Sequence, residues 1–243
     1  IKRLLLAGGA YDPPLRSVDS IVEEIINPEE FELPPVEKIS FEGDFIPVLA
    51  STGIPPVDRR LADAASYLIA RGVSLEKMRT FDIRYSYTGR YADRIIVPCY
   101  NNKELVTFVA RDITGLSKKY LNPTGVAQAR CLFNLDQVSD YSSVVLAEGV
   151  FDAIAVHPIP VVASFGKKLS VAQQTALNKF NEVILYWDID AFPDAEKFAS
   201  KLTTNVKVVL HDEAGRDAGS RTREENLDLI NSAVSFDSVD FHT

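Results

Sequence analysis

Hydrophobic residues in the second half of the chain form four short, mostly apolar runs. The runs are VVLA, VVAS, VILYW and VKVVL, and they lie between residues 144 and 210. Runs that are apolar at successive positions are typical of parallel strands covered by helices on both faces. The stretches between them predict helices over 151–157, 170–180 and 192–203. We therefore predict a parallel βαβαβαβ unit, which is an α/β architecture.

The first half of the chain mixes helical and alternating patterns. Residues 58–72 predict a helix that Asp58 caps at its start and Gly72 at its end. Its apolar face consists of Leu61, Ala65, Leu68 and Ile69. A second short helix is predicted from Ser74. The stretch RIIVPCYNNKELVTFVARDI predicts a hairpin of two strands that turns at Asn101-Asn102.

These patterns divide the chain into four parts and make it α+β overall. Residues 1–57 predict a short helix at 17–27 followed by an extended, proline-rich linker or arm. Residues 58–142 predict a smaller mixed helix and hairpin subdomain. Residues 143–220 hold the parallel unit, and residues 221–243 are a C-terminal tail or helix.

Composition limits the classes of protein that the chain can belong to. It has 243 residues, 46% of them hydrophobic, with a net charge of -8, two cysteines and three histidines. Because there is no Cys-x-x-Cys pair, we expect no zinc site in this chain. No apolar run reaches the length of a transmembrane helix, so we expect no membrane partner. Two cysteines in a chain of this length suit a reducing cytoplasm.

Acidic residues follow the ends of three of the four apolar runs. VVLA leads into Glu148, VILYW leads into Asp188 and Asp190, and VKVVL is followed by acids as far as Asp217. Since the carboxyl ends of parallel strands meet at one edge of a sheet, we expect these acids to lie close together. Neighbouring carboxylates repel one another unless a cation balances them, and Mg²⁺ prefers oxygen ligands. The sequence therefore predicts a Mg²⁺ or Mn²⁺ site at this edge.

Any one of these acids taken alone also fits a purely structural role. A carboxylate at a strand end or in the first turn of a helix is often only a cap. This alternative is strongest for Asp152, which lies in the first turn of the helix predicted after Glu148. The joint pattern of Glu-Gly after one strand and Asp-x-Asp after another favours the metal site.

These acidic motifs resemble the TOPRIM domain that topoisomerases and DnaG-type primases share. In that family one strand ends in Glu-Gly, here AEGVFDAIAV, and a later strand ends in Asp-x-Asp, here YWDIDAFPDAEKFA. Three upstream stretches are similar to the DnaG primase catalytic core, in the same order: YLIARGVSLEKMRTFDIRYS, RIIVPCYNNKELVTFVARDI and KKYLNP. The resemblance covers roughly residues 60–220.

The resemblance implies an enzyme that joins nucleoside triphosphates into short RNA primers on single-stranded DNA. It implies that Glu148, Asp188 and Asp190 are the catalytic, metal-binding acids, and that Asp152 and Asp217 are supporting metal-binding acids. Gly219 stands where the family usually has a second acid or amide after Asp217, which weighs against a complete second acidic pair.

Basic and polar residues of the same stretches, and one lysine in the glycine turn near the acids, are expected to bind the template and the nucleotides. They are Arg94, Arg111, Lys118, Lys119, Tyr120, Asn122 and Lys167. From the residues alone, Tyr120 fits core packing as well as base stacking. Lys118, Lys119 and Lys167 fit exposed loops as well as phosphate contacts.

Two other functions use the same motifs. A TOPRIM nuclease would cut nucleic acid with the same acids and metal, and a non-catalytic replisome subunit would only bind it. For a primase, the expected partners are single-stranded DNA, nucleoside triphosphates and a replicative helicase, in a bacterial or phage-infected cytoplasm. The zinc domain of DnaG-type primases is not in this sequence, so we expect slow, poorly selective primer synthesis by this chain.

Overall fold

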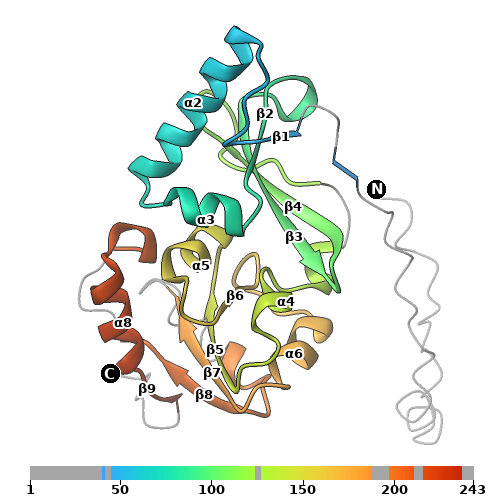
Figure 1. Ribbon diagram of the computed structural model, residues 1–243. Helices are drawn as coiled ribbons and strands as arrows, with labels where there is room; N and C mark the ends of the chain where they lie inside the picture. The colour runs from blue at the N-terminus through green and yellow to red at the C-terminus, as the bar shows by residue number, and fades with distance from the viewer. Residues whose placement is uncertain (1–39, 42–44, 124–126, 188–196, 211–215, 237–243) are drawn as a thin grey trace, which may run out of the picture. The chain divides into compact units, whose positions relative to one another are not determined.

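The computed structural model of the chain describes residues 40–41, 45–123, 127–187, 197–210 and 216–236 (Figure 1). All of them belong to one compact unit, Val36–Thr243. The helix predicted at 17–27 and most of the predicted arm lie outside the described residues. None of the described helices has the length and hydrophobicity needed to cross a membrane.

The first sheet is antiparallel and has the strand order β1-β2-β3-β4. Its strands are β1 (Phe45–Pro47), β2 (Arg84–Ser86), β3 (Arg94–Asn101) and β4 (Glu104–Asp112). The predicted hairpin is confirmed, although the turn is one residue later, at Asn102 and Lys103, which have φ angles of 52° and 64°. β1 lies within the predicted arm, so part of that arm is a strand. Phe45 is buried and packs edge-on against Tyr91 and Phe108.

Two helices lie between β1 and β2 in the sequence: α2 (Pro55–Ala70) and α3 (Leu75–Thr80). α2 starts three residues before the predicted Asp58, because Pro55 and Pro56 suit the first turn of a helix. Asp58 instead accepts hydrogen bonds from the backbone amides of Thr52 and Gly53, at 2.7 and 3.2 Å. Ser74 caps α3 as predicted, by accepting a bond from the Lys77 amide.

α2 ends where the sequence predicts, whereas its apolar face agrees with the prediction only in part. Gly72 has a φ of +75°, and the amides of Gly72 and Val73 close a Schellman motif on the carbonyls of Ile69 and Leu68. The buried residues are Val57, Leu61, Ala64 and Leu68. The placement of Ile69 on the apolar face was wrong, because this side chain is 55% exposed.

The second sheet contains the predicted parallel unit. Its order is β6-β5-β7-β8-β9, and the first four strands are parallel. The strands are β5 (Ser143–Ala147), β6 (Val161–Ala163), β7 (Glu182–Tyr186), β8 (Asn205–Val208) and β9 (Val234–Ser235). The intervening helices are α5 (Val150–Val156) and α6 (Val171–Leu177), and residues 197–199 are also helical. Ser170 and Gln173 form the capping box that the sequence predicts for α6.

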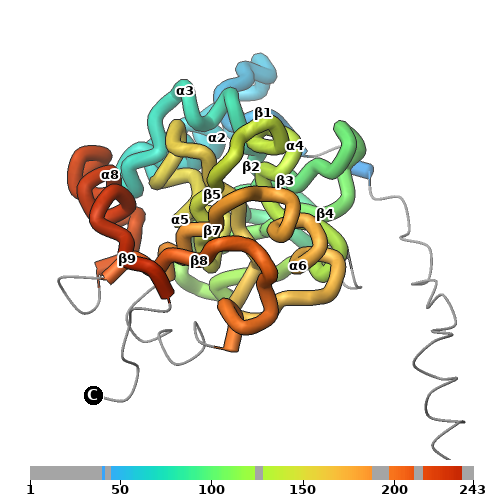
Figure 2. The backbone as a smooth tube through the Cα atoms, turned by 90° about the horizontal axis from the view of Figure 1, so that it is seen from below, coloured from blue at the N-terminus to red at the C-terminus, as the bar shows by residue number. Residues whose placement is uncertain are grey.

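Helices cover both faces of this sheet, as the apolar runs predict. Val145 and Ala147 of β5 belong to the same core as α5, which also includes Leu61 and Ile95 of the first subdomain. Val144 and Leu146 point to the opposite face, where they share a core with α6. Figure 2 shows α6 and α8 on different sides of the strands. The core next to α5 therefore joins the two sheets.

The chain beyond residue 220 continues the second sheet. α8 (Arg223–Asn231) leads to β9, which pairs antiparallel with β8. The short elements are η1 (Gly89–Tyr91), η2 (Ala127–Arg130), α4 (Leu135–Val138) and η4 (Ala218–Ser220). The predicted C-terminal tail thus includes a helix and an edge strand, which cover part of the sheet.

Candidate active site

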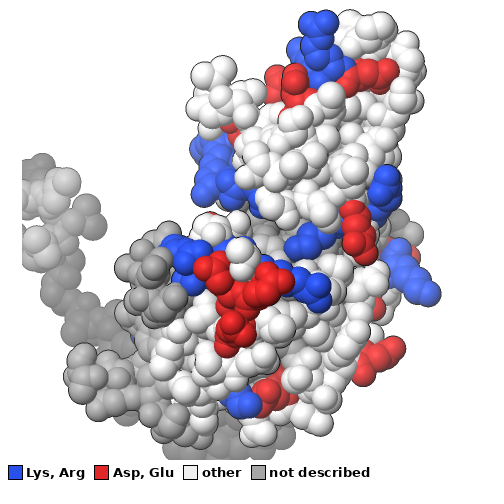
Figure 3. All heavy atoms as spheres, turned by 60° about the vertical axis from the view of Figure 1, so that its left-hand side comes forward, with Lys and Arg blue, Asp and Glu red and all other residues white. Residues whose placement is uncertain are grey.

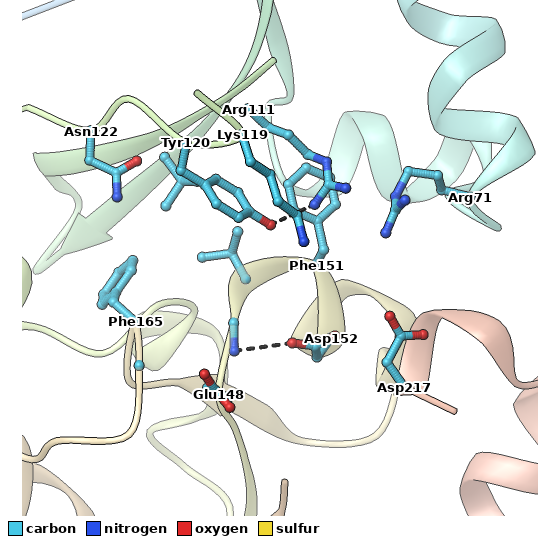
Figure 4. A pocket seen from close by; sticks show the side chains of 14 residues that line it. Arg71, Arg111, Lys119, Tyr120, Asn122, Glu148, Phe151, Asp152, Phe165 and Asp217 are labelled. Atoms are coloured by element: carbon cyan, nitrogen blue, oxygen red, sulfur yellow. Dashed lines mark hydrogen bonds between the residues drawn. The ribbon is translucent and has the colours of Figure 1, made fainter. Parts of the chain in front are cut away.

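A pocket of about 370 Å³ lies between the end of β5 and the segment that follows β4 (Figure 4). It brings together seven of the residues that the sequence singled out: Arg111, Lys119, Tyr120, Asn122, Glu148, Asp152 and Asp217. The first and last of them, Arg111 and Asp217, are 106 residues apart in the sequence. The cationic side chains lie on one side of the pocket and the acidic ones on the other.

The acidic side begins where β5 ends. Glu148 follows Ala147, the last residue of the strand, and Gly149 caps α5. Asp152 folds back so that its Oδ2 accepts a hydrogen bond from the Gly149 amide at 3.2 Å. A Cβ on residue 149 would lie 2.8 Å from that oxygen, which is too close for a real contact. The glycine of the Glu-Gly pair therefore lets Asp152 stay next to Glu148.

The loop after β6 closes over the same strand end. The Gly166 amide donates to the Glu148 carbonyl at 3.0 Å, and the Ser164 amide donates to the Ala147 carbonyl at 3.3 Å. Phe165 between them has a left-handed φ of 63°, which is uncommon for a bulky residue. Its ring lines the pocket. Backbone hydrogen bonds thus hold the Glu148 main chain to the loop after β6.

Two of the expected catalytic acids, Asp188 and Asp190, lie outside the described residues. β7 ends at Tyr186, which pairs in parallel register with Ala147 of the neighbouring β5. Glu148 comes one residue after Ala147, and Asp188 comes two residues after Tyr186. The chain therefore leaves two adjacent strands at the same sheet edge just before each acid. Convergence of these acids stays a prediction.

Asp217 reaches the pocket from a different segment. It caps η4, and its Oδ1 accepts a hydrogen bond from the Ser220 amide at 2.9 Å. Gly219 follows in the same turn, where a Cβ would meet Asp217 Oδ1 at an ordinary 3.6 Å. α5 and η4 are in contact, which brings Asp217 to the side of the pocket where Asp152 lies.

The donor atoms on the acidic side suit a hard divalent cation. Glu148, Asp152 and Asp217 supply carboxylate oxygens, which Mg²⁺ and Mn²⁺ prefer. Within the described ranges, no three histidine, cysteine or acidic side chains lie close enough to hold an ion by themselves. The chemistry of these side chains fits a metal, and Asp188 and Asp190 are the sequence candidates for completing the ligand set.

On the cationic side, Arg111 is the most firmly held residue. It is 7% exposed; its Nε donates to the Tyr67 hydroxyl at 2.7 Å and its Nη1 to the Tyr120 hydroxyl at 2.5 Å. The guanidinium also lies 5.0 Å from the centre of the Phe151 ring. Burial acts to lower the pKa of Arg111, but the bonds to the two phenols outweigh it and raise this pKa. Arg111 therefore presents a fixed positive charge to the pocket.

Tyr120 is neither a core residue nor a free surface side chain. Its backbone pairs with that of Arg111, and the cations of Arg111 and Lys119 lie 5.3 and 5.7 Å from the centre of its ring. The residue stays 39% exposed. Burial and the nearby Asp152 raise the pKa of its hydroxyl, although Arg111 acts against them. A neutral, half-open aromatic ring at the pocket wall suits stacking on a base.

The pocket also contains two residues that sequence reasoning missed. Arg71 follows the last turn of α2 and lies 5.9 Å from the rings of both Tyr67 and Phe151. Its Nε is buried with no hydrogen-bond partner among the described residues. Phe165 lies in the loop after β6, and nothing in the sequence pattern marks its ring as a pocket residue. The signal for Arg71 was its place in YLIARG, within a stretch that resembles the DnaG core, but that resemblance does not single out this side chain.

Three predicted nucleic-acid contacts lie apart from this pocket. Arg94 is 4% exposed and bonds to the loop after β4. Lys118 precedes the pocket residue Lys119 and is exposed, and Lys167 follows Gly166 without lining the pocket. Figure 3 shows one face of the molecule, on which a group of acidic side chains lies next to lysines and arginines.

The architecture of the chain matches solved structures of one class of protein. A DnaG primase catalytic domain bound to single-stranded DNA aligns with a TM-score of 0.66 and 19% identity, over 82% of this chain and 81% of that one. The chain has the fold of the DnaG primase catalytic core. An Aquifex aeolicus primase aligns with a TM-score of 0.62 and 21% identity, over 72% of this chain.

The similarity extends to a phage protein. The primase fragment of the bacteriophage T7 primase-helicase aligns with a TM-score of 0.55 and 21% identity, over 68% of this chain and 72% of that one. This chain spans 56% of the Aquifex chain, which also contains a zinc-binding domain. No family model and no curated protein matches the sequence. The DnaG-type fold agrees with the resemblance drawn from the sequence.

Proposed function

We propose that this chain is the RNA polymerase core of a DNA primase and synthesises short RNA primers on single-stranded DNA. The observation that carries the proposal is the pocket of the DnaG-type fold, which sets three carboxylates opposite three cationic side chains. Nucleotidyl transfer needs both kinds of group, because a polyanionic substrate has to be bound and charge develops at the reacting phosphate.

In the proposed reaction a ribose 3′ hydroxyl attacks the α-phosphate of a nucleoside triphosphate. A new phosphorus–oxygen bond forms, the bond to pyrophosphate breaks, and the hydroxyl proton leaves to a base or to water. Glu148, Asp188 and Asp190 would hold Mg²⁺ or Mn²⁺, with Asp152 and Asp217 in support. A bound divalent ion lowers the pKa of an attacking oxygen and neutralises the leaving one.

The protein's own groups have separate tasks in this proposal. Arg111 and Lys119 bind phosphate oxygens, Asn122 supplies an amide beside them, and Tyr120 stacks on a base. Lys118 and Lys167 extend the contacts to template phosphates outside the pocket. Single-stranded DNA, nucleoside triphosphates and a replicative helicase are the proposed partners. The similar DnaG catalytic domain was solved with single-stranded DNA, and the similar T7 fragment belongs to a primase-helicase.

One assay tests this proposal. The purified chain is incubated with single-stranded DNA, labelled ribonucleoside triphosphates and Mg²⁺ or Mn²⁺, and both the products and the template are resolved on a gel. We expect oligoribonucleotides, formed slowly and with little sequence preference, and none from Asp188→Ala. Shortened template would identify a nuclease instead, and binding without either product would identify a non-catalytic subunit.

A further inference from the structure

Two buried, oppositely charged residues lie beneath the loop 113–118, which connects β4 to the pocket. Arg94 of β3 is 4% exposed and Asp112 of β4 is 8% exposed, and the two are opposite each other in the strand register. Buried charged groups are costly unless hydrogen bonds satisfy them. The hydrogen-bond partners of Arg94 and Asp112 therefore indicate the role of these two residues.

A single hydroxyl links the two charges. Arg94 Nη2 donates to Ser117 Oγ at 2.5 Å, and Ser117 Oγ donates to Asp112 Oδ1 at 3.1 Å. Arg94 Nη1 donates to the Lys118 carbonyl at 2.9 Å. Both ends of this network thus hold the part of the loop that leads into Lys119 and Tyr120.

Asp112 fixes the other half of the loop. Its carboxylate accepts bonds from the Gly115 amide at 2.7 Å and the Thr114 hydroxyl at 3.0 Å. Burial acts to raise the pKa of Asp112, but these hydrogen bonds and the charge of Arg94 lower it, so the carboxylate stays ionised. Gly115 has a φ of +73°, which lets the loop turn back.

The loop ends in two adjacent lysines. Lys118 is exposed, and Lys119 lines the pocket with its Nζ 5.7 Å from the Tyr120 ring. The Asp112 amide donates to the Lys119 carbonyl at 3.0 Å, so the strand pairing continues up to this residue. The backbone that carries both lysines is therefore held in one conformation by Arg94, Ser117 and Asp112.

We propose that Arg94 and Asp112 are positioning residues that hold the loop 113–118 so that Lys118 and Lys119 meet the phosphates of a single-stranded DNA template. The inference rests on the proposed function and assigns Arg94 an indirect role in place of the direct nucleic-acid contact expected from the sequence. A preformed loop binds more tightly because it loses less conformational entropy on binding.

The test is the salt dependence of binding to a labelled oligo(dT) strand. Each phosphate contact to single-stranded DNA contributes about 0.7 to the slope of log K against log salt, so Lys118→Ala/Lys119→Ala should lower the slope by about 1.4. We expect Arg94→Met and Ser117→Ala to lower both the affinity and the slope. We expect Arg94→Met to add nothing further when the two lysines are already absent.

Arg84→Met is the matched control. Arg84 lies in β2 of the same sheet and donates to Asp82 Oδ2 at 3.0 and 3.1 Å, but it does not line the pocket. Thermal unfolding of each variant accompanies the binding measurement. Ser117→Ala removes only one hydroxyl from an exposed residue, so it decides the question if Arg94→Met does not fold.

The outcomes separate this inference from the proposed function. If the unaltered chain neither binds the strand nor makes primers, the proposed function fails and the inference fails with it. In a second outcome, the unaltered chain binds the strand and makes primers, while Ser117→Ala and Arg94→Met show the same slope of log K against log salt as the unaltered chain and Arg84→Met. That result overturns the inference alone. A lower slope in both variants, absent in the lysine-free background, supports it.

Discussion

Gly149 gives the sharpest test of how the acidic side of the pocket is built. Its amide donates to Asp152 Oδ2 at 3.2 Å, and a Cβ at this position would lie 2.8 Å from the same oxygen. Gly149→Ala should therefore displace the Asp152 carboxylate and break the bond. Loss of such a helix-capping interaction costs about 1 kcal/mol. Replacing glycine by alanine also stabilises the folded protein by about 0.4–1 kcal/mol, because the unfolded chain has less conformational entropy to lose.

The two terms nearly cancel, so the single variant is not decisive for stability and a double-mutant cycle is needed. In the Asp152→Ala background there is no carboxylate to displace, and Gly149→Ala should then stabilise the protein by about 0.4–1 kcal/mol. The expected coupling between the two positions is about 1 kcal/mol, measured as the free energy of unfolding in urea.

Gly219→Ala is the control, because its Cβ would meet Asp217 Oδ1 at 3.6 Å, an ordinary contact distance. It should leave Asp217 in place. In the primer-synthesis assay Gly149→Ala should lose more activity than Gly219→Ala. Equal effects of Gly149→Ala with and without Asp152 would refute this account of the Glu-Gly pair.

Three further predictions concern the cationic side of the pocket and the loop beneath it. A lysine at position 111 cannot bond both phenols, so Arg111→Lys should lower the free energy of unfolding by about 1–3 kcal/mol. The same variant should bind oligo(dT) more weakly. Unchanged values in urea unfolding and in binding titrations would contradict this prediction. Tyr120→Leu should weaken oligo(dT) binding by about 1–3 kcal/mol while Tyr120→Phe keeps most of it, and equal losses would argue against stacking. Because the pKa of Asp112 is lowered from 3.8, its contribution to stability is present above that pH and is lost on acidification. Asp112→Asn should therefore lose less stability than the unaltered chain between about pH 5 and pH 2.5 in unfolding curves, and parallel losses would contradict the shift.

The sequence predicted those features that depend on local pattern. Runs apolar on both faces gave the parallel strands, and Ser170 and Ser74 marked helix starts through short-range hydrogen bonds. Glu148, Asp152 and Asp217 could be placed near one another because parallel strands and their following turns share a sheet edge. These relations involve residues close in sequence or a general rule of sheet topology.

Features that depend on packing between distant segments could not be predicted in this way. Phe45 of β1 looks like part of an arm, and only the Tyr91 and Phe108 rings make it a core residue. Arg71 reaches the pocket because α2 packs near Phe151. An arginine such as Arg94 is a residue type that suits phosphate binding. Because Arg94 lies opposite Asp112, however, its side chain lies beneath the loop and bonds to it.

The central claim is that Glu148, at the carboxyl end of β5, belongs to a divalent-metal site. Titration of Mn²⁺ into the chain, followed by electron paramagnetic resonance, tests this directly. Glu148→Gln should weaken the tightest Mn²⁺ binding by at least about tenfold. Glu182→Gln is the control, because Glu182 lies at the opposite end of the neighbouring β7, where it pairs with Lys207 at 2.9 Å. The Glu182→Gln variant should bind Mn²⁺ as tightly as the unaltered chain. Equal Mn²⁺ affinity in the unaltered chain and in Glu148→Gln would contradict the claim.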